Sequence, residues 1–301
     1  MRVELGAPTR LERCFGLHRF GPADPTTRIE PGRVSFACHT PDGPAVLDIQ
    51  ARSDTVFEVE GHGPGGPGLE ARAEQILGKD DAPETFEPLC SGTRTLVRRV
   101  SGLRIVATPA PHALLATLVL QQRVAWKDAA KEFRWIVKRW GSDAPGDFGL
   151  RLAPAPKVWT KIPLAELSAL GMDRKRAETL KRVAQVANRI DALVGRPFDE
   201  VRRKLLSVPG LGPWTVEHLL GLGFGDADAL PTGDYDLHHR VASVLAGKAR
   251  SSDAEMVELM EKYRGHRFRV IRMIEEAGVR LVRFAPRRAS PPRPRGGFRR
   301  P

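Results

Sequence analysis

Hydrophobic and polar positions follow a strand-like pattern in the first third of the chain. Apolar residues alternate loosely with polar ones at 34–40 and 45–51, which is typical of half-buried β-strands. The tripeptide Pro-Asp-Gly at 41–43 is a turn sequence, so the two strands are predicted to form a hairpin. A third strand is expected at 55–60. We therefore predict a small β-rich α/β subdomain with an antiparallel sheet over residues 1–90.

The pattern changes to a helical period from about residue 108 onward. Residues 112–123 are apolar on most faces, as in a buried helix, whereas 125–140 carries its apolar residues on one stripe. The other predicted helices span 164–170, 174–190, 198–208, 214–224, 235–246, 253–263 and 267–277. The predicted fold class is therefore mainly α, with a helical domain over residues 91–285 after the α/β subdomain. Four tryptophans are expected in the core: Trp126, Trp135, Trp140 and Trp159.

Composition excludes several classes of protein. The chain has 301 residues, 41% of them hydrophobic, which is enough for two domains with full cores. No uncharged apolar stretch reaches roughly eighteen residues and the first residues lack an apolar signal region, so we expect a cytoplasmic protein with no membrane partner. The cysteines Cys14, Cys38 and Cys90 match no zinc pattern and are too few for a four-Cys iron–sulfur cluster.

The charge balance favours a polyanionic partner. The formal net charge is +12, which suits nucleic acid or an anionic membrane surface. Residues 286–301 contain six Arg and no acidic residue, so about half of the net charge falls in this segment. Its Arg/Pro-rich composition predicts a disordered basic tail.

A helical hairpin with glycines at its corner, at residues 205–220, is the most informative segment. The glycines leave backbone amides open at the start of the second helix. A helix N-terminus carries a partial positive charge, so a phosphate can dock there, and Leu211 is expected to fill the gap between the helices. The full pattern is more specific than an ordinary glycine turn. The residues assigned to DNA contact here are Pro209, Gly210, Leu211, Gly212 and Thr215.

One carboxylate follows this hairpin closely. Asp234 stands twenty residues after Trp214, at the start of the next predicted helix. The ordinary role of an aspartate in such a place is to cap the helix. The hairpin upstream favours a second interpretation, in which the carboxylate takes part in chemistry on DNA.

Residues 205–241 resemble the helix-hairpin-helix–Gly/Pro–Asp superfamily of DNA glycosylases, most closely its bacterial 3-methyladenine DNA glycosylase II branch. The resemblance extends to 120–122 and 170–178. It implies that Asp234 is the catalytic aspartate, because breaking an N-glycosidic bond builds positive charge on the deoxyribose that a carboxylate stabilises. It also implies a monomer that acts on double-stranded DNA with a damaged base. No cofactor is implied, apart from a structural monovalent cation at the hairpin.

The resemblance also indicates the subclass and the base pocket. Bifunctional members carry a Lys where this chain has Trp214, and that Lys forms a Schiff base with the sugar. An indole cannot form an imine, so base removal without strand cleavage is expected. A flipped base would enter a pocket formed by Trp214, His218, Tyr235 and His266. The two histidines replace aromatic residues of the branch and would also suit hydrogen bonding to a neutral or oxidised base.

Further DNA contacts are implied at the loop after residues 120–122. There Gln122 and Arg123 would probe or fill the space left by the flipped base, although an ordinary surface charge is the alternative interpretation of Arg123. Arg267 matches a further DNA-contacting position of the branch.

The function expected from the sequence is hydrolysis of damaged bases, alkylated or deaminated purines, from duplex DNA by a monofunctional glycosylase. Two alternatives remain open. One is a non-catalytic module that binds damaged DNA on the same scaffold, and the other is a glycosylase for oxidised bases such as 8-oxoguanine.

Overall fold

The computed structural model describes residues 1–279, and the basic segment 286–301 lies outside the described residues. A five-stranded antiparallel sheet in the order β1-β5-β4-β3-β2 forms the N-terminal part. The predicted hairpin is confirmed as β3–β4, with Thr40 paired to Gly43 around a two-residue turn. The strands are β1 (Arg2–Glu4), β2 (Thr27–Glu30), β3 (Arg33–Thr40), β4 (Gly43–Ala51) and β5 (Val56–His62).

Alternating residues of the central strands build an apolar core on one face of the sheet. Val34 and Phe36 of β3 lie beside Leu47 and Ile49 of β4, and these four side chains are buried. Each such side chain contributes roughly 1.5–3 kcal/mol through its removal from water. Short helices cover this core: α1 (Leu11–Cys14), α2 (Gly66–Glu70) and α3 (Ala73–Ile76).

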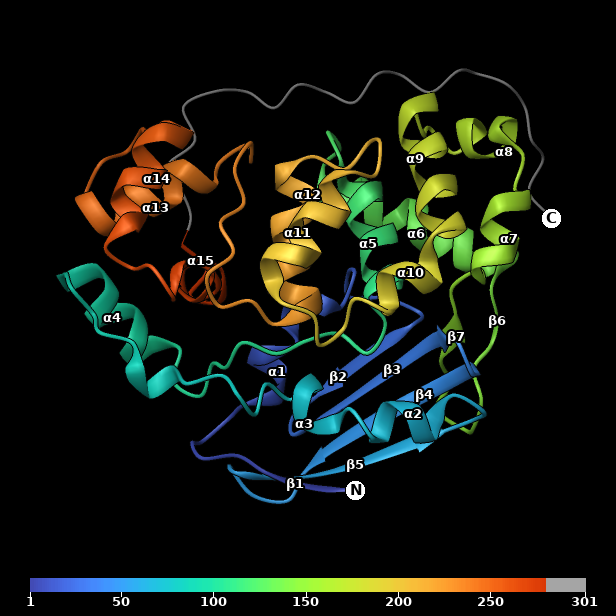
Figure 1. The fold of residues 1–301 in the computed structure, drawn as a ribbon, viewed down its shortest axis with the longest axis horizontal. Helices are drawn as coiled ribbons and strands as arrows, with labels where there is room; N and C mark the ends of the chain where they lie inside the picture. Colours follow the sequence, from blue (N-terminus) through green and yellow to red (C-terminus); the bar gives the residue numbers. More distant parts are fainter. Residues whose placement is uncertain (280–301) are drawn as a thin grey trace.

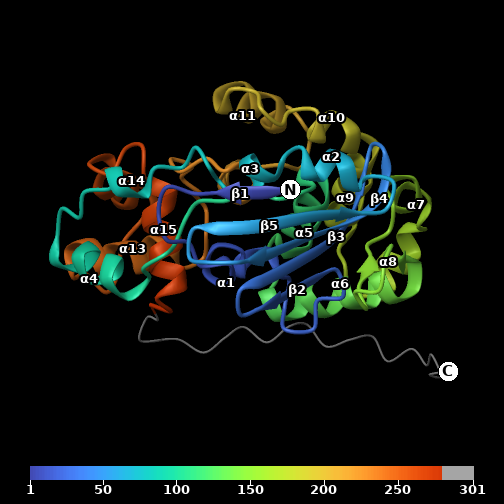
Figure 2. The ribbon, with the colours of Figure 1, turned by 90° about the horizontal axis from the view of Figure 1, so that it is seen from below.

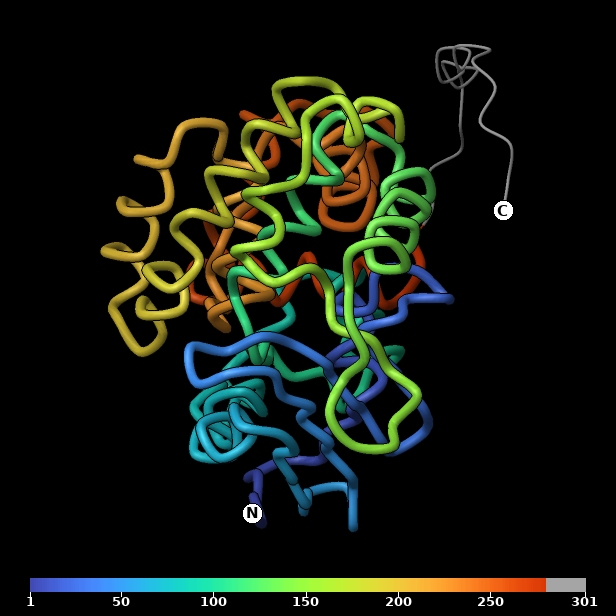
Figure 3. Tube along the Cα trace, turned by 90° about the vertical axis from the view of Figure 1, so that its right-hand side faces the viewer, coloured from blue at the N-terminus to red at the C-terminus, as the bar shows by residue number. Residues whose placement is uncertain are grey.

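The remaining helices form the predicted helical part, which lies above the sheet in Figure 1. Figure 3 shows the same two layers from the side, with the strands at the bottom. The helices are α4 (Ser91–Arg99), α5 (Pro111–Gln121), α6 (Trp126–Trp140), α7 (Pro156–Lys161), α8 (Leu164–Ala169), α9 (Arg174–Gln185), α10 (Ala187–Asp191), α11 (Phe198–Leu206), α12 (Pro213–Leu219), α13 (Leu237–Ala246), α14 (Asp253–Glu261) and α15 (Arg267–Glu276). A two-stranded ribbon, β6 (Ser142–Asp143) and β7 (Arg151–Leu152), follows α6.

Helix α5 is the centre of this helical part. Its sequence predicts burial on most faces, and Leu115, Val119 and Leu120 are fully buried. It packs against α6, α9, α10 and α12. Because α5 packs against α6, α9 and α10 as well as against the hairpin helix α12, it determines the position of the hairpin in the helical part.

Two predicted helices are interrupted in the structure. The segment 174–190 is divided at Val186 into α9 and α10. The segment 214–224 changes after Leu219 into a π-helical turn, Leu220–Phe224. A Cβ at Gly221 in this turn would lie 2.3 Å from the Phe268 ring, so glycine is required for α15 to pack here.

Helix α15 connects the helical part to the sheet part. Arg269 forms an ion pair with Asp81, and the two side chains are only 3% and 5% exposed. Arg272 donates from Nη2 to the carbonyl oxygens of Arg13 and Cys14, at 2.9 and 3.4 Å. Figure 2 shows α4, α13, α14 and α15 gathered at one end of the sheet, with α7 and α8 at the other. Within residues 1–279, no helix has the length and apolar character needed to cross a bilayer.

Candidate active site

The predicted hairpin is present, and its loop depends on one glycine more than on the other. Helices α11 and α12 are joined by residues 207–212, called here the hairpin loop. Gly210 has φ +97°, and a Cβ there would lie 2.3 Å from Thr179 Oγ1 of α9. Gly212 has an extended backbone with φ −98° and ψ 175°, and a Cβ on it would meet nothing within 4 Å. The backbone of the hairpin loop therefore requires glycine at position 210 but not at position 212.

The start of α12 has the features expected of a phosphate site. Leu211 is buried in the helical core, as predicted, and holds the hairpin loop against the helices. Gly212 is the N-cap of α12 and makes no side-chain capping bond, and Pro213 is the first helical residue. The next amides, those of Trp214 and Thr215, point out of the helix end, where the partial charge of α12 favours an anion.

The loop after α5 is attached to the hairpin loop by a side-chain amide. Gln122 donates from Nε2 to the Gly210 carbonyl oxygen at 3.1 Å and to Thr215 Oγ1 at 2.9 Å. The next residue, Arg123, is exposed and has φ +60°. Among the described residues it is the only non-glycine residue with positive φ. Such strained positions concentrate at functional sites, and Arg123 directly follows Gln122, which binds the hairpin loop.

The carboxylate of Asp234 is bound to the hairpin through Trp214. Trp214 Nε1 donates to Asp234 Oδ2 at 2.7 Å. The amides of Asp236 and Leu237 both donate to Oδ1 at 3.0 Å. Asp234 precedes α13 by three residues, so the predicted start of this helix at residue 235 is two residues too early. Its carboxylate accepts a hydrogen bond from the Leu237 amide, but the N-cap of α13 is Asp236, so Asp234 is not the helix cap that the sequence left as the alternative.

The surroundings of Asp234 keep it ionised. Burial raises the pKa of Asp234, but the hydrogen bonds from Trp214 and from the amides of Asp236 and Leu237 lower it, and the resulting pKa lies below its usual value. An ionised, partly buried carboxylate beside a phosphate-binding helix end can stabilise a neighbouring cation.

His218 lies with Trp214 on one face of α12. Their ring centroids are 4.6 Å apart, and His218 Nδ1 donates to the Trp214 carbonyl oxygen at 2.8 Å. A carbonyl only accepts, so Nδ1 carries the proton and Nε2 of the neutral ring is an acceptor. Tyr235, the third residue assigned to the base pocket, is 92% exposed, so it lies at the surface beside Asp234 rather than in a closed pocket.

His266 and Arg267 form hydrogen bonds with residues outside the site around Asp234. His266 Nδ1 accepts from Arg269 Nε at 3.1 Å, so Nε2 carries the proton and is 3.2 Å from Thr85 Oγ1. Both nitrogens of His266 therefore have partners. Arg267 forms a two-point ion pair with Asp228, at 2.8 and 2.6 Å. Within residues 1–279 no hydrogen bond joins His266 or Arg267 to Asp234.

Sequence reasoning missed a group that supports the turn before Asp234. Asp253, the first residue of α14, accepts the Gly233 amide on Oδ2 at 2.9 Å. Gly233 has φ +80°, so this bond fixes a left-handed turn one residue before the carboxylate. Nothing local in the sequence pairs residues 233 and 253, and only the packing of α14 on α13 reveals the contact.

The described residues contain no group of three or more His, Cys, Asp or Glu side chains that could hold a metal ion. A monovalent cation at the hairpin would instead need backbone carbonyl oxygens. Those of Val208 and Gly210 each accept one hydrogen bond, from the Leu211 amide and from Gln122. Each keeps a second lone pair for such an ion, and the cation stays a prediction.

Comparison with known proteins supports the resemblance drawn from the motif. No family model matches the chain. A curated relative, the "probable bifunctional transcriptional activator/DNA repair enzyme AlkA" of Mycobacterium tuberculosis, is 29% identical over 174 residues, which are 56% of this chain and 34% of the relative. The chain therefore spans about a third of the length of the curated relative it matches.

Solved structures confirm the predicted fold class. A 3-methyladenine DNA glycosylase from Archaeoglobus fulgidus superposes with a TM-score of 0.77 at 19% identity, covering 94% of this chain and 100% of that one. The 8-oxoguanine glycosylase/lyase of Clostridium acetobutylicum, in complex with double-stranded DNA, gives 0.62 at 13% identity, covering 92% and 96%. At these identities the likeness concerns the fold: a helical glycosylase domain with an N-terminal antiparallel sheet.

Proposed function

We propose that this chain is a monofunctional DNA glycosylase that removes damaged bases from duplex DNA by hydrolysis. The observation that carries the proposal is the 2.7 Å hydrogen bond from Trp214 Nε1 to Asp234 Oδ2. This bond holds an ionised carboxylate at the first turn of the hairpin helix α12. The same group of residues would then contact both a DNA phosphate, bound at the hairpin, and the sugar of an extruded nucleotide.

The carboxylate would act on the sugar. As the bond from C1′ to the base nitrogen breaks, the base takes the bonding electron pair and positive charge develops on the deoxyribose. Asp234 stabilises this charge without moving, because Trp214 and two backbone amides already hold its oxygens in place. A water oxygen then bonds to C1′, and its proton passes to Asp234 or to solvent.

Trp214 is also the reason to propose hydrolysis without strand cleavage. A lyase reaction needs an amine that bonds to C1′ at this place. The indole offers only an N–H that already donates to Asp234. The product expected is therefore an intact strand with an abasic site.

Duplex DNA would be held by the hairpin loop and by the loop after α5. Gln122 connects the two loops, and the exposed, strained Arg123 would enter the stack where the base leaves. Because Arg267 is neutralised by Asp228, its role in DNA contact would require this ion pair to open. We assign Arg267 to DNA contact only on the resemblance.

Alkylated or deaminated purines are the proposed substrates. The neighbouring rings of Trp214 and His218, tilted by 43° to each other, offer a ring face for an electron-poor base. His218 Nε2 adds a hydrogen-bond acceptor that a base N–H would satisfy. Because both nitrogens of His266 are taken, we expect His218 rather than His266 to read the base edge.

The test is an excision assay on duplexes that carry an alkylated purine, hypoxanthine, ethenoadenine or 8-oxoguanine, with and without alkali. We expect strand breaks only after alkali. In Asp234→Asn the single-turnover rate is expected to fall at least about 1,000-fold, while affinity for abasic duplex changes less than about twofold. The matched control is Asp236→Asn, whose side chain is 40% exposed and pairs with Arg240; it should keep its rate within about threefold.

Other outcomes would identify the alternatives. Breaks without alkali would indicate a lyase. Tight binding with no abasic product in the wild-type protein would indicate a binding module. An equal loss of DNA affinity in Asp234→Asn would make the residue structural.

A further inference from the structure

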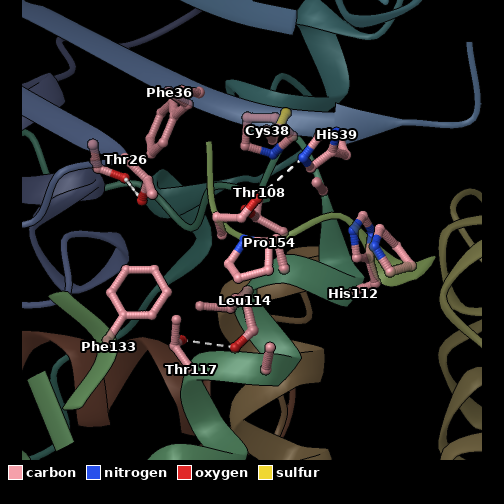
Figure 4. A pocket seen from close by; sticks show the side chains of 18 of the residues that line it. Thr26, Phe36, Cys38, His39, Thr108, His112, Leu114, Thr117, Phe133 and Pro154 are labelled. Atoms are coloured by element: carbon pink, nitrogen blue, oxygen red, sulfur yellow. Dashed lines mark hydrogen bonds between the residues drawn. The ribbon is translucent and has the colours of Figure 1, made fainter. Parts of the chain in front are cut away.

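A cavity lies where the sheet meets the helices, and its lining residues are far from Asp234 along the chain. It has a cavity volume of about 70 Å³ and opens to solvent, and its walls come from β2, β3, α5, α6, α7 and α9. Figure 4 shows Phe36 and Phe133 on one side of it and His39 and His112 on the other. Neither Asp234 nor Trp214 nor His218 lines it. The proposed glycosylase reaction does not use this cavity.

Two of its histidines are neutral rings with one acceptor nitrogen each. His39 Nε2 is 3.1 Å from the Ala153 carbonyl oxygen, and His18 Nε2 is 2.8 Å from that of Leu222. Because a carbonyl only accepts, Nε2 carries the proton in both rings and Nδ1 carries the lone pair. Burial lowers the pKa of His39 and lowers that of His18 to about 4, so both rings are uncharged at neutral pH.

The third histidine also bonds to the protein through one ring nitrogen. His112 Nδ1 is 2.6 Å from Asp191 Oδ2, so it donates to the carboxylate and leaves Nε2 as the remaining polar atom. His18 Nδ1 is buried, and within residues 1–279 it has no hydrogen-bond partner. A buried acceptor without a donor costs about 1–3 kcal/mol. His18, His39 and His112 thus each bond one ring nitrogen to the protein, and all three residues line the same cavity.

The rest of the lining restricts the ligand further. Among residues 1–279 no Lys or Arg lines the cavity, so the described lining does not favour an anion. Asp24 accepts from the Phe20 and Thr26 amides and from Thr26 Oγ1, which leaves little capacity to hold a cation. Phenylalanine rings and aliphatic side chains supply flat apolar walls.

From this arrangement we propose that the cavity binds an uncharged planar heterocycle bearing N–H donors, of the size of a free purine base. Its N–H groups donate to the imidazole lone pairs, and its ring packs between the sheet and α5. The proposal stands independently of the glycosylase function, because it uses none of the residues assigned to that reaction.

The test uses the full chain labelled with ¹⁵N-histidine, at pH 7.5, with adenine as the probe and quinoline as a probe of similar size without an N–H. We expect saturable shifts of the His18 and His39 Nδ1 signals with a Kd of about 1 mM or lower for adenine. Quinoline should bind at least about tenfold more weakly. No saturable shift up to about 10 mM adenine, or equal affinity for the two probes, would overturn the proposal.

Two variants separate this cavity from the active site. His39→Phe keeps a ring but removes an acceptor, and should weaken adenine binding about tenfold while quinoline binding is retained. His218→Phe makes the same change at the active site and should leave the His18 and His39 shifts intact. If His218→Phe abolished these shifts instead, adenine would occupy the active site and the proposal would fail. If His39→Phe does not fold, the comparison of adenine with quinoline on the wild-type chain decides the question.

Discussion

At the scale of single residues, Trp214 sets the charge state of Asp234. Its indole N–H is the strongest of the groups that lower the pKa of this carboxyl against the effect of burial. Trp214→Phe keeps a ring but removes the donor, so the pKa of Asp234 should rise. Activity requires the ionised form, so the acidic limb of the pH–rate profile should move to higher pH. Single-turnover excision rates measured between about pH 3 and pH 8 check this.

Trp159→Phe is the control for this change. Trp159 is buried in the helical core and makes no side-chain hydrogen bond in the described part of the chain. Its replacement should leave the acidic limb in place. A Trp214→Phe profile that coincides with the wild type would mean that the backbone amides alone keep Asp234 ionised.

Asp253 is expected to position Asp234 without touching DNA. Its Oδ2 accepts the Gly233 amide, and Asp253→Ala removes this acceptor from the turn. We expect kcat to fall about tenfold with KM nearly unchanged. Asp253→Asn retains an oxygen that can accept from Gly233 and should recover most of kcat. Equal losses in both variants, or a change confined to KM, would argue against positioning.

Which site residues could be predicted from sequence depends on how local their partners are. The hairpin loop and Asp234 lie within one short motif, so their pattern predicted them. Arg267 pairs with Asp228 and His266 with Thr85, which lies 181 residues away. Tertiary packing determines such partners. The sequence therefore predicted a DNA contact for Arg267 and a base contact for His266, but it did not reveal the residues that they bind in the free protein.

At the scale of elements, the turn of the hairpin loop depends on Gly210. Alanine there needs φ near +97° and places its Cβ against Thr179, so Gly210→Ala should lower the free energy of unfolding by about 2 kcal/mol. Gly212→Ala is the matched control, since its backbone is extended and its Cβ site is open. It should change stability by less than about 0.5 kcal/mol. Urea unfolding of the two variants tests this, and similar losses in both would contradict it.

Helices with a long apolar period were predicted well. The short strands and two of the tryptophans were not, and each failure has an identifiable cause. The edge strands β1 and β2 have three and four residues, which is too short for a clear alternation. Trp126 and Trp135, expected in the core, are 45% and 47% exposed. They lie on the surface of α6, where Trp135 contacts the Arg139 guanidinium. A tryptophan on a helix is buried only when the face of the helix that carries it packs against the core.

At the scale of the whole molecule, the pair of Arg269 and Asp81 joins α15 to the segment that follows the sheet. Arg269→Leu leaves the Asp81 carboxylate buried without its partner and should lower the free energy of unfolding by about 3–5 kcal/mol. The control Arg264→Leu breaks an exposed pair with Glu261 and should cost less than about 1 kcal/mol. Chemical denaturation compares the two, and a loss below about 1 kcal/mol in Arg269→Leu would show that the pair contributes little.

The contacts of α15 have a consequence for synthesis on the ribosome. Arg272 is translated 259 residues after Arg13, whose carbonyl oxygen it binds, and Arg269 follows Asp81 by 188 residues. Until α15 has emerged from the exit tunnel, the carbonyl oxygens of Arg13 and Cys14 can accept hydrogen bonds only from water or from a chaperone. The sheet can assemble early, but its junction with the helices closes only when nearly all of the described chain has left the ribosome.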